Sequence, residues 1–162
     1  MRITHRTTIF FDASVLVAGA HSVQGGSALL LEACKRCGFT AQATFLIILE
    51  AFHTLERNFP QTSMARFRSY LGDIDWDILP VPPEDELQEY ASLIHPKDLH
   101  VLAAAVAGGS EFLLTLDRQH ILAAIPAVKE AQLAIRILTP GDFIQQIYPL
   151  HEDFPSLPPR RE

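Results

Sequence analysis

The chain has 162 residues, the length of one ordinary domain, and 48% of them are hydrophobic, which is enough for a packed core rather than a disordered chain. Its net charge is −6, so it lacks the broad basic surface of a dedicated nucleic-acid-binding module. No apolar run reaches the roughly 18 residues that span a bilayer, and two cysteines are too few for a disulfide framework. The N-terminal residues also lack the apolar core of a secretion signal. We therefore expect a cytoplasmic protein without a membrane association.

The hydrophobic pattern predicts alternating strands and helices. Residues 8–12 are apolar without alternation, which is typical of a short strand buried on both faces. A helix is expected over residues 25–37, between a glycine-rich start and Gly38. The other expected elements are, in order, strand 39–43, helix 44–57 with Thr44 as its N-cap, helix 62–71, strand 76–81, a helix opening at 83–85, a helix from Pro96 to Gly108, strand 112–116, short helix 118–124, strand 133–138 and helix 140–147.

This alternation predicts an α/β fold: a three-layer α/β/α sandwich around a mostly parallel central sheet. No repeat or low-complexity block interrupts the pattern, so residues 1–147 are expected to form a single domain. Residues 148–162 contain four prolines and are expected to form a C-terminal tail.

Four carboxylates occupy positions where a purely structural role is hard to find. Asp12 and Asp117 each follow an apolar, strand-like run. Asp98 opens a helix-like stretch, and Glu50 interrupts the apolar residues of an expected helix. Ligands of parallel sheets sit beyond the C-terminal ends of the strands, where Asp12 and Asp117 fall. If the fold brings the four together, they form an oxygen-rich pocket for a hard divalent cation. The pattern thus predicts a metal-dependent enzyme acting on phosphate esters.

Each of these residues also has a structural interpretation. Asp12 and Asp117 could cap or begin a turn, and Asp98 could be an ordinary helix cap. Glu50 could lie on a helix face turned toward solvent. His95 and His100 flank Asp98, but no cysteine or third histidine is near in sequence, so we expect a turn residue and a helix residue rather than zinc ligands.

Other enzyme classes fit the sequence less well. A phosphohydrolase with an aspartate nucleophile needs a second acid two residues after the first, and position 14 is serine. A phospho-accepting receiver domain needs paired acids after the first strand, where only Asp12 is present. A dinucleotide-binding domain needs a glycine-rich turn after that strand, which is absent as well.

The ordered motifs resemble those of a PIN domain, and in particular prokaryotic single-domain PIN proteins of the toxin–antitoxin type. The resemblance covers roughly residues 8 to 147 and is carried by Phe11-Asp12-Ala13-Ser14-Val15-Leu16-Val17, Glu50, Pro96-Lys97-Asp98-Leu99-His100-Val101-Leu102-Ala103-Ala104-Ala105, Leu114-Thr115-Leu116-Asp117 and Leu138-Thr139-Pro140-Gly141-Asp142-Phe143.

This resemblance implies a metal-dependent ribonuclease that cleaves RNA phosphodiester bonds. The family's metal-binding acids match Asp12, Glu50, Asp98 and Asp117, which would hold Mg²⁺ or Mn²⁺. Ser14 and Thr115 match positions that support the site. The resemblance also implies a cognate antitoxin as protein partner and a homodimer.

The chain departs from the family after Asp117. Many PIN domains carry a further acid there, whereas this chain has Arg118-Gln119-His120. The departure puts a second metal position in doubt and leaves Arg118 or His120 to contact phosphate. Two alternatives stay open at this point: an RNA-processing nuclease outside any toxin pair, and a PIN fold used only for binding, which would be expected to have lost acids.

Overall fold

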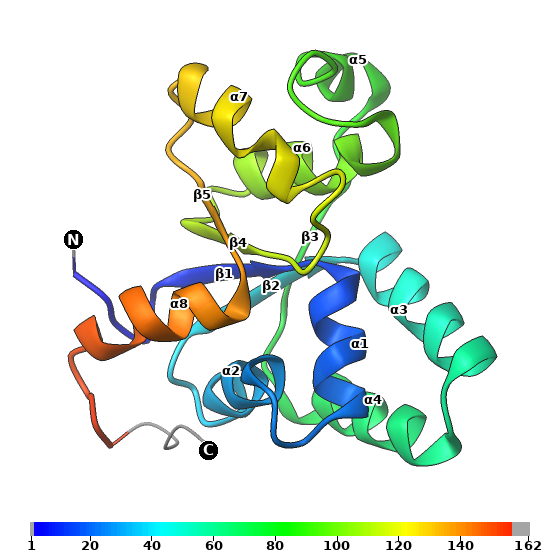
Figure 1. Cartoon of the computed structure of the whole chain (residues 1–162), viewed down its shortest axis with the longest axis vertical. Coiled ribbons are helices and arrows are strands. Elements are labelled where there is room, and N and C mark those ends of the chain that lie inside the picture. The colour runs from blue at the N-terminus through cyan, green and yellow to red at the C-terminus, as the bar shows by residue number, and fades with distance from the viewer. Residues whose placement is uncertain (1, 157–162) are drawn as a thin grey trace.

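Figure 1 shows the computed structural model of the protein, which describes residues 2–156. Within these residues a single sheet of five strands has the order β3-β2-β1-β4-β5, and all neighbouring strands are parallel. The strands are β1 (Thr8–Phe11), β2 (Thr40–Thr44), β3 (Asp77–Leu79), β4 (Phe112–Leu114) and β5 (Arg136–Leu138).

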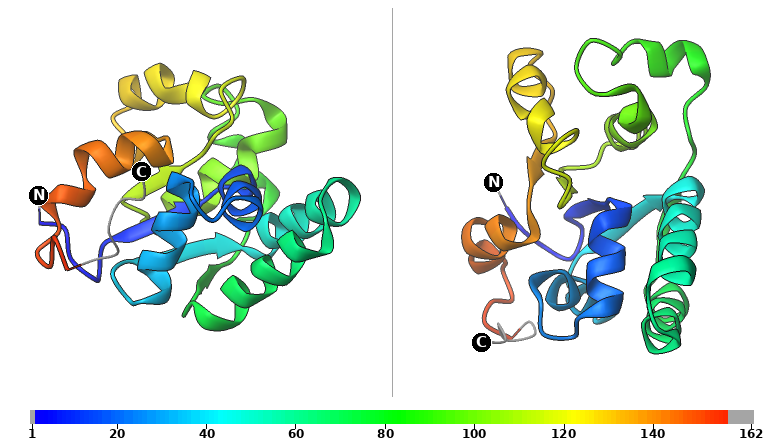
Figure 2. Two further views of the ribbon diagram at one scale, coloured as in Figure 1. Left: turned by 60° about the horizontal axis from the view of Figure 1, so that its bottom comes forward. Right: turned by 45° about the vertical axis from the view of Figure 1, so that its right-hand side comes forward.

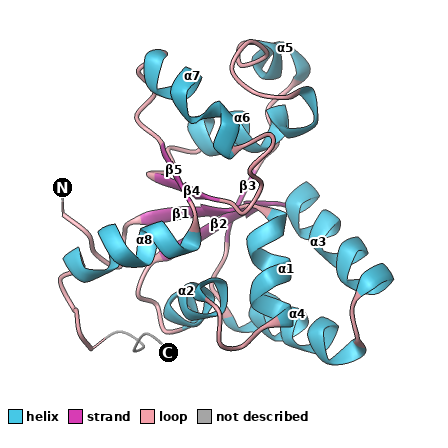
Figure 3. Ribbon diagram, in the orientation of Figure 1, coloured by secondary structure: helices cyan, strands magenta, loops and turns pink. Residues whose placement is uncertain are grey.

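Helices cover both faces of this sheet. The α-helices are α1 (Ala13–His21), α2 (Gly26–Lys35), α3 (Phe45–Asn58), α4 (Gln61–Asp73), α5 (Glu84–Gln88), α6 (Leu99–Ala107), α7 (Ile125–Glu130) and α8 (Pro140–Gln146). Three short 3₁₀ helices are η1 (Pro96–Asp98), η2 (Leu122–Ala124) and η3 (Tyr148–Leu150). Helices α1 to α4 and α8 lie on one face, and α6 and α7 lie on the other (Figures 1 and 3). The predicted three-layer α/β/α sandwich with a parallel sheet is confirmed.

The burial of the central strand β1 explains why its sequence is apolar without alternation. Strand β1 pairs with β2 on one side and β4 on the other, and Ile9, Phe10 and Phe11 are completely buried. A strand covered by helices on both faces has no polar face, so its sequence runs apolar without alternation. Phe112 on β4 is also fully buried, and its ring meets Phe143 of α8 edge-on at 5.1 Å.

Helix α3 begins as the sequence predicted. The Thr44 hydroxyl accepts a hydrogen bond of 3.2 Å from the backbone N–H of Ile47, which satisfies one of the unpaired donors of the first turn. Helix α3 packs against α4 (Figure 2) and leaves its outer side toward solvent.

Two elements differ from the expectation. Helix α1 was not predicted, because it packs against α2, α3 and α4 and is apolar almost all round, so it lacks the polar stripe by which a surface helix is recognised. The helix expected over 118–124 lies later in the chain, where η2 runs into α7. The residues after β4 instead form a turn held by Asp117, described below.

The described part of the C-terminal segment folds back on the N-terminus. Tyr148 and His151 are buried, and His151 forms a parallel bridge with Ile3. The end of the expected tail, residues 157–162, lies outside the described residues, and the domain boundary at residue 147 stays a prediction. No single described helix is long and apolar enough to cross a membrane; α1 and α2 taken together pass on length and composition, but they are bent by 95°.

Candidate functional site

The C-terminal ends of β1 and β4 place two of the expected site residues side by side. These strands are parallel neighbours, with Phe11 opposite Leu114 in the register. Asp12 follows β1 directly, Thr115 follows β4 directly, and the backbone N–H of Asp12 donates to the carbonyl of Leu114 at 3.0 Å. Both side chains therefore emerge at the same edge of the sheet, where parallel sheets bind their ligands.

Asp12 is held by two hydroxyl groups. The Ser14 Oγ donates to Asp12 Oδ2 at 2.7 Å, and the Thr115 Oγ1 donates to the same oxygen at 2.8 Å. Each hydroxyl also accepts a backbone N–H at 3.0 Å, from Leu116 and Asp117 respectively. Because the oxygen of each hydroxyl is occupied by an amide, its own proton is directed at the carboxylate. Ser14 and Thr115 thus hold Asp12 in one orientation.

The surroundings of Asp12 make its ionised form costly. The carboxylate is only 6% exposed. Burial raises the pKa of the Asp12 carboxyl above its usual value, the hydrogen bonds from Ser14, Thr115 and the Ala13 backbone oppose that shift, and the negative charge of Asp98 adds to it. The pKa remains raised in sum, so a cation beside Asp12 would relieve the cost of keeping it ionised.

Glu50 lies in the second turn of α3 and is exposed. Three of the apolar residues that precede it are exposed as well, Phe45 by 66%, Leu46 by 44% and Leu49 by 38%, whereas Ile47 and Ala51 are fully buried. The helix face turned toward solvent, one of the two interpretations of the sequence, is therefore the one observed. Even so, partial desolvation raises the pKa of the Glu50 carboxyl, and the charges of Asp12, Asp98 and Asp117 raise it further. The Glu50 carboxylate is thus electrostatically part of the same acidic cluster.

Asp98 and Asp117 meet at a histidine. Asp98 occupies the N-cap position of α6 but makes no side-chain cap hydrogen bond; its Oδ2 lies 3.0 Å from Nδ1 of His120. Asp117 holds its own turn, because its Oδ1 accepts the backbone N–H groups of Gln119 and His120, both at 3.0 Å. Its Oδ2 lies 3.7 Å from the same His120 nitrogen. The turn interpretation of Asp117 and its place in the cluster are therefore both observed.

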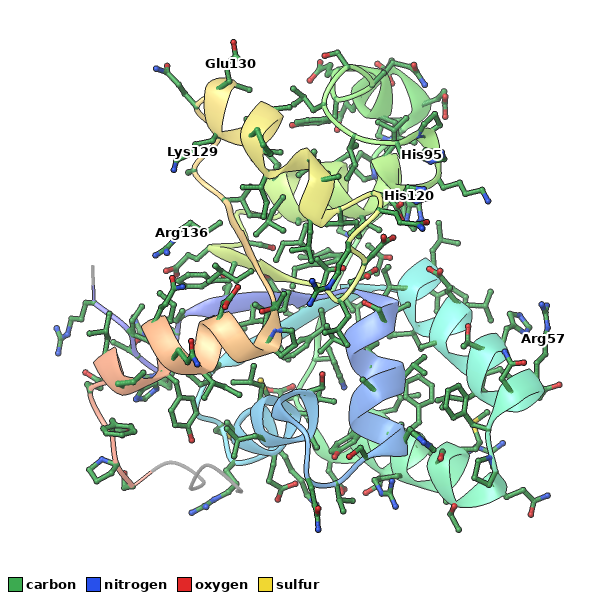
Figure 4. All side chains as sticks on the ribbon, viewed as in Figure 1. Arg57, His95, His120, Lys129, Glu130 and Arg136 are labelled. Atoms are coloured by element: carbon green, nitrogen blue, oxygen red, sulfur yellow. The ribbon has the colours of Figure 1, made fainter. Side chains whose placement is uncertain are left out.

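The sequence did not predict an imidazole pair at this position. The rings of His95 and His120 are stacked, with centroids 3.9 Å apart and planes within 9° (Figure 4). One donor atom from each of His95, Asp98 and His120 lies within 4.8 Å of the others. The available signal for His120 was the departure after Asp117, where it stands near the place of the further family acid. His95 flanks Asp98 in the sequence, but a turn residue was expected there because no third histidine is near in sequence; the fold brings His120 to it.

His100 lies close to the same acids from α6. Its Nδ1 is buried and has no hydrogen-bond partner among the described residues. Burial lowers the pKa of the His100 imidazole, while the charges of Asp98 and Asp12 oppose that shift. Its ring is therefore favoured in the neutral form, and it contributes no charge that would balance the acids.

The acidic cluster has no Lys or Arg to neutralise it. Across residues 2–156, none of Asp12, Glu50, Asp98 and Asp117 forms an ion pair with a Lys or Arg, and His120 is the ionisable base that contacts them. The cations Arg57, Lys129 and Arg136 lie away from the histidine pair (Figure 4). Buried or crowded carboxylates are normally paired or bound to a metal, and carboxylate oxygens are the ligands that Mg²⁺ and Mn²⁺ prefer. Carboxylates without such a partner make this edge of the sheet a candidate site for a divalent cation.

The family model for the PIN domain matches residues 8–119, a span that includes all four acids. No curated protein sequence matches the chain.

Two solved structures share the fold. VapBC2 from Rickettsia felis, bound to a DNA fragment from the promoter, aligns with a TM-score of 0.58 at 11% identity over 81% of this chain and 98% of that chain. PAE2754 from Pyrobaculum aerophilum aligns with a TM-score of 0.52 at 23% identity over 74% of this chain and 86% of that chain. These identities are low, so the two likenesses concern the fold. With the family match over more than half of its length, the chain belongs to the PIN domain family.

Proposed function

We propose that this protein is a metal-dependent endoribonuclease that hydrolyses RNA phosphodiester bonds with Mg²⁺ or Mn²⁺. The observation that supports this most strongly is the group of four acids without a Lys or Arg partner among residues 2–156, in which Asp12 is buried and the charges of Asp12, Asp98 and Asp117 raise the pKa of Glu50. A fold that needed these groups only for stability would pair them with cations or replace them. Membership of a family whose members are typically nucleases supports the same function.

The residues have distinct tasks in this proposal. Asp12, Glu50, Asp98 and Asp117 hold the cation, which when bound supplies an activated water and charge stabilisation at the phosphate. Ser14 and Thr115 keep the buried carboxylate of Asp12 oriented toward that position. Arg118 is exposed directly after Asp117, where it can contact a phosphate of the RNA backbone.

We further propose that the protein is the toxin of a toxin–antitoxin pair, with a cognate antitoxin as partner, and that it forms a homodimer in the cytoplasm. The resemblance of its motifs to toxins of that type and the fold shared with VapBC2 support this role. The exposed residues Phe45, Leu46 and Leu49 on α3 supply an apolar surface beside Glu50 that suits a protein partner. The retention of all four acids favours a nuclease over a PIN fold used only for binding.

The direct test is cleavage of a fluorescent RNA by the purified protein. We expect cleavage with Mg²⁺ or Mn²⁺, none with EDTA, and a fall of roughly 10³-fold in Asp12→Asn with either ion. Asp142→Asn is the matched control, because Asp142 is an exposed acid in the first turn of α8, and it should leave cleavage unchanged. Equal cleavage by the wild type and Asp12→Asn, or none by either, would contradict the nuclease. The toxin role is tested separately: a small protein encoded next to the gene should bind this chain and block cleavage.

A further inference from the structure

We propose that His95, Asp98 and His120 form a binding site for a divalent transition-metal ion that accepts imidazole ligands, such as Co²⁺, Ni²⁺ or Zn²⁺. This site would share Asp98 with the acidic cluster. The inference concerns ion binding alone, so it does not depend on the cleavage of RNA.

The fold brings three candidate ligands together from different segments of the chain. His95 precedes η1, whereas His120 follows the turn after β4, so the fold and not the local sequence brings them together. Their rings are stacked at 3.9 Å, and a donor atom from each of the three residues lies within 4.8 Å of the others. Ligands about 2.0–2.2 Å from one ion lie roughly 3–3.5 Å apart, so the side chains need to close by on the order of 1 Å.

His120 and Asp98 already place two donor atoms at the spacing of two ligands. Nδ1 of His120 lies 3.0 Å from Asp98 Oδ2, close to the separation of two ligand atoms on one ion. An ion bound by both atoms would replace the hydrogen bond between them, and its binding would release the shared proton.

His95 has to exchange one contact in order to bind. Its Nδ1 accepts the backbone N–H of Lys97 at 3.1 Å and thereby caps η1. Ligation through this nitrogen replaces a neutral hydrogen bond by a metal–imidazole bond, which is the stronger interaction. His95 is exposed, so the ring can move without disturbing the core.

The donor atoms of the three residues favour a transition metal over Mg²⁺. Mg²⁺ favours oxygen ligands and near-ideal octahedral geometry, whereas imidazole nitrogen suits Zn²⁺, Ni²⁺ and related ions. Two imidazoles and one carboxylate also leave coordination positions open, as in catalytic zinc sites. The imidazoles of His95 and His120 put nitrogen donors at this end of the acidic cluster, so we expect it to prefer these transition-metal ions over Mg²⁺.

The test uses the full-length protein and Co²⁺, whose visible spectrum reports its ligands, together with calorimetric titrations of Co²⁺, Zn²⁺ and Mg²⁺. We expect the wild type to bind Co²⁺ and Zn²⁺ with a spectrum indicating nitrogen ligands. His120→Asp should weaken Co²⁺ binding by about 100-fold and not weaken Mg²⁺ binding, and His95→Gln should weaken Co²⁺ binding by about 10-fold. His5→Gln, at an exposed histidine near the N-terminus, is the matched control and should change nothing.

Circular dichroism of each variant separates loss of the site from loss of the fold, and the exposed position of His95 makes His95→Gln the safer variant. Unchanged Co²⁺ affinity in both His95→Gln and His120→Asp would overturn the proposal, as would a Co²⁺ spectrum with oxygen ligands only. Mg²⁺-dependent RNA cleavage together with either result would leave the proposed function intact. Imidazole-bound Co²⁺ in a protein that cleaves no RNA would support the site and contradict the nuclease.

Discussion

Asp12, at the end of β1, accepts hydrogen bonds from Thr115 at the end of the adjacent strand and from Ser14 in α1. Asp98 instead contacts the imidazole of His120 from a loop, and the ring of His95 is stacked on that imidazole. In the first half of the site, Ser14 and Thr115 both donate to one carboxylate oxygen, and their own oxygens are held by backbone amides. In the second half, Asp98 and Asp117 both approach Nδ1 of His120 from different segments.

The site therefore has two halves. The strand-end half, around Asp12, is fixed by the geometry of the sheet, and the loop half, around Asp98 and His120, is assembled by loops. The strand-end half is buried and oriented before any ligand arrives, and its cost is the raised pKa of Asp12. The loop half is more open, with side-chain exposures of 16% for Asp98 and 29% for His120. The first half therefore suits a fixed ligand position, and the second suits adjustment to the ion that binds.

Asp12→Asn is expected to have the largest effect and to separate the two halves most clearly. The asparagine oxygen can still accept both hydroxyl groups, but the charge is lost, so metal-dependent RNA cleavage should fall by roughly 10³-fold, about 4 kcal/mol of transition-state stabilisation. Without metal the same change removes a costly buried charge, and we expect the free energy of unfolding to rise by about 1 kcal/mol, which raises Tm by roughly 3 °C. Cleavage assays and thermal denaturation with EDTA measure the two effects.

Asp98→Asn is the matched comparison for the loop half. It should also reduce cleavage, but it weakens the hydrogen bond to His120 and relieves less burial, so the metal-free protein should not gain stability. If both variants stabilise the metal-free protein equally, the two halves do not differ in the way proposed.

Thr115→Val tests whether orientation by hydroxyl groups matters as much as charge. The valine has nearly the same shape but removes the donor to Asp12 and the acceptor for the Asp117 amide. We expect a 10- to 100-fold loss in cleavage and in Mn²⁺ affinity, as for other groups that orient metal ligands. Thr62→Val, at an exposed threonine on α4, is the control. An unchanged Mn²⁺ affinity in Thr115→Val would show that the carboxylate needs no such support.

In the strand-end half, the position of Asp12 could be predicted from the sheet alone. Asp12 comes directly after an unbroken apolar strand, at the edge where parallel sheets bind ligands. Thr44 could be predicted in the same way as the cap before an apolar helix. These inferences need only the local sequence and the direction of the strands. Thr115 lay within the expected strand over residues 112–116, and only the resemblance to PIN domains indicated its role.

The loop half could not be predicted, for a physical reason. The stacking of His95 on His120 depends on how η1 approaches the turn after β4, and no periodicity in either segment encodes that approach. Glu50 shows a related limit: the apolar residues on both sides of it do not tell which face of the helix is buried, and Phe45, Leu46 and Leu49 are exposed. An apolar surface kept for a partner has the same sequence signature as a core.

The pH dependence of stability should also distinguish the halves. The ordinary pKa of an aspartate is 3.8, and the folded value for Asp12 is higher, so between the two the folded protein binds more protons than the unfolded chain. The stability of the metal-free protein due to Asp12 therefore falls as pH rises through that interval and stays reduced above it. Glu50, with an ordinary pKa of 4.5 that is also raised, acts in the same direction.

Thermal denaturation from pH 4 to pH 8 with EDTA, for the wild type and Asp12→Asn, isolates the contribution of Asp12. We expect the Tm advantage of Asp12→Asn to grow as pH rises. With Mn²⁺ at about 100 times its Kd, the wild type should gain about 2.7 kcal/mol, and this gain should shrink as pH falls because protons compete for the carboxylates. A Tm advantage of Asp12→Asn that shrinks with rising pH would reverse the assigned sign.

Thr44→Ala is expected to have the smallest effect. It tests whether Glu50 is fixed in advance, as Asp12 is, or adjusts to the bound ion, as the loop half does. Glu50 reaches the cluster from α3, and the start of that helix is held by the hydroxyl of Thr44, which accepts the N–H of Ile47. Loss of this cap should lower the free energy of unfolding by about 1 kcal/mol, measured by urea denaturation. If α3 holds Glu50 in place through its first turn, Mn²⁺ affinity should fall several-fold in Thr44→Ala, whereas Thr62→Val on the neighbouring helix should change neither quantity. A stability loss with unchanged Mn²⁺ affinity would mean that Glu50 adjusts to the ion as the loop half does, and that only Asp12 is fixed in advance.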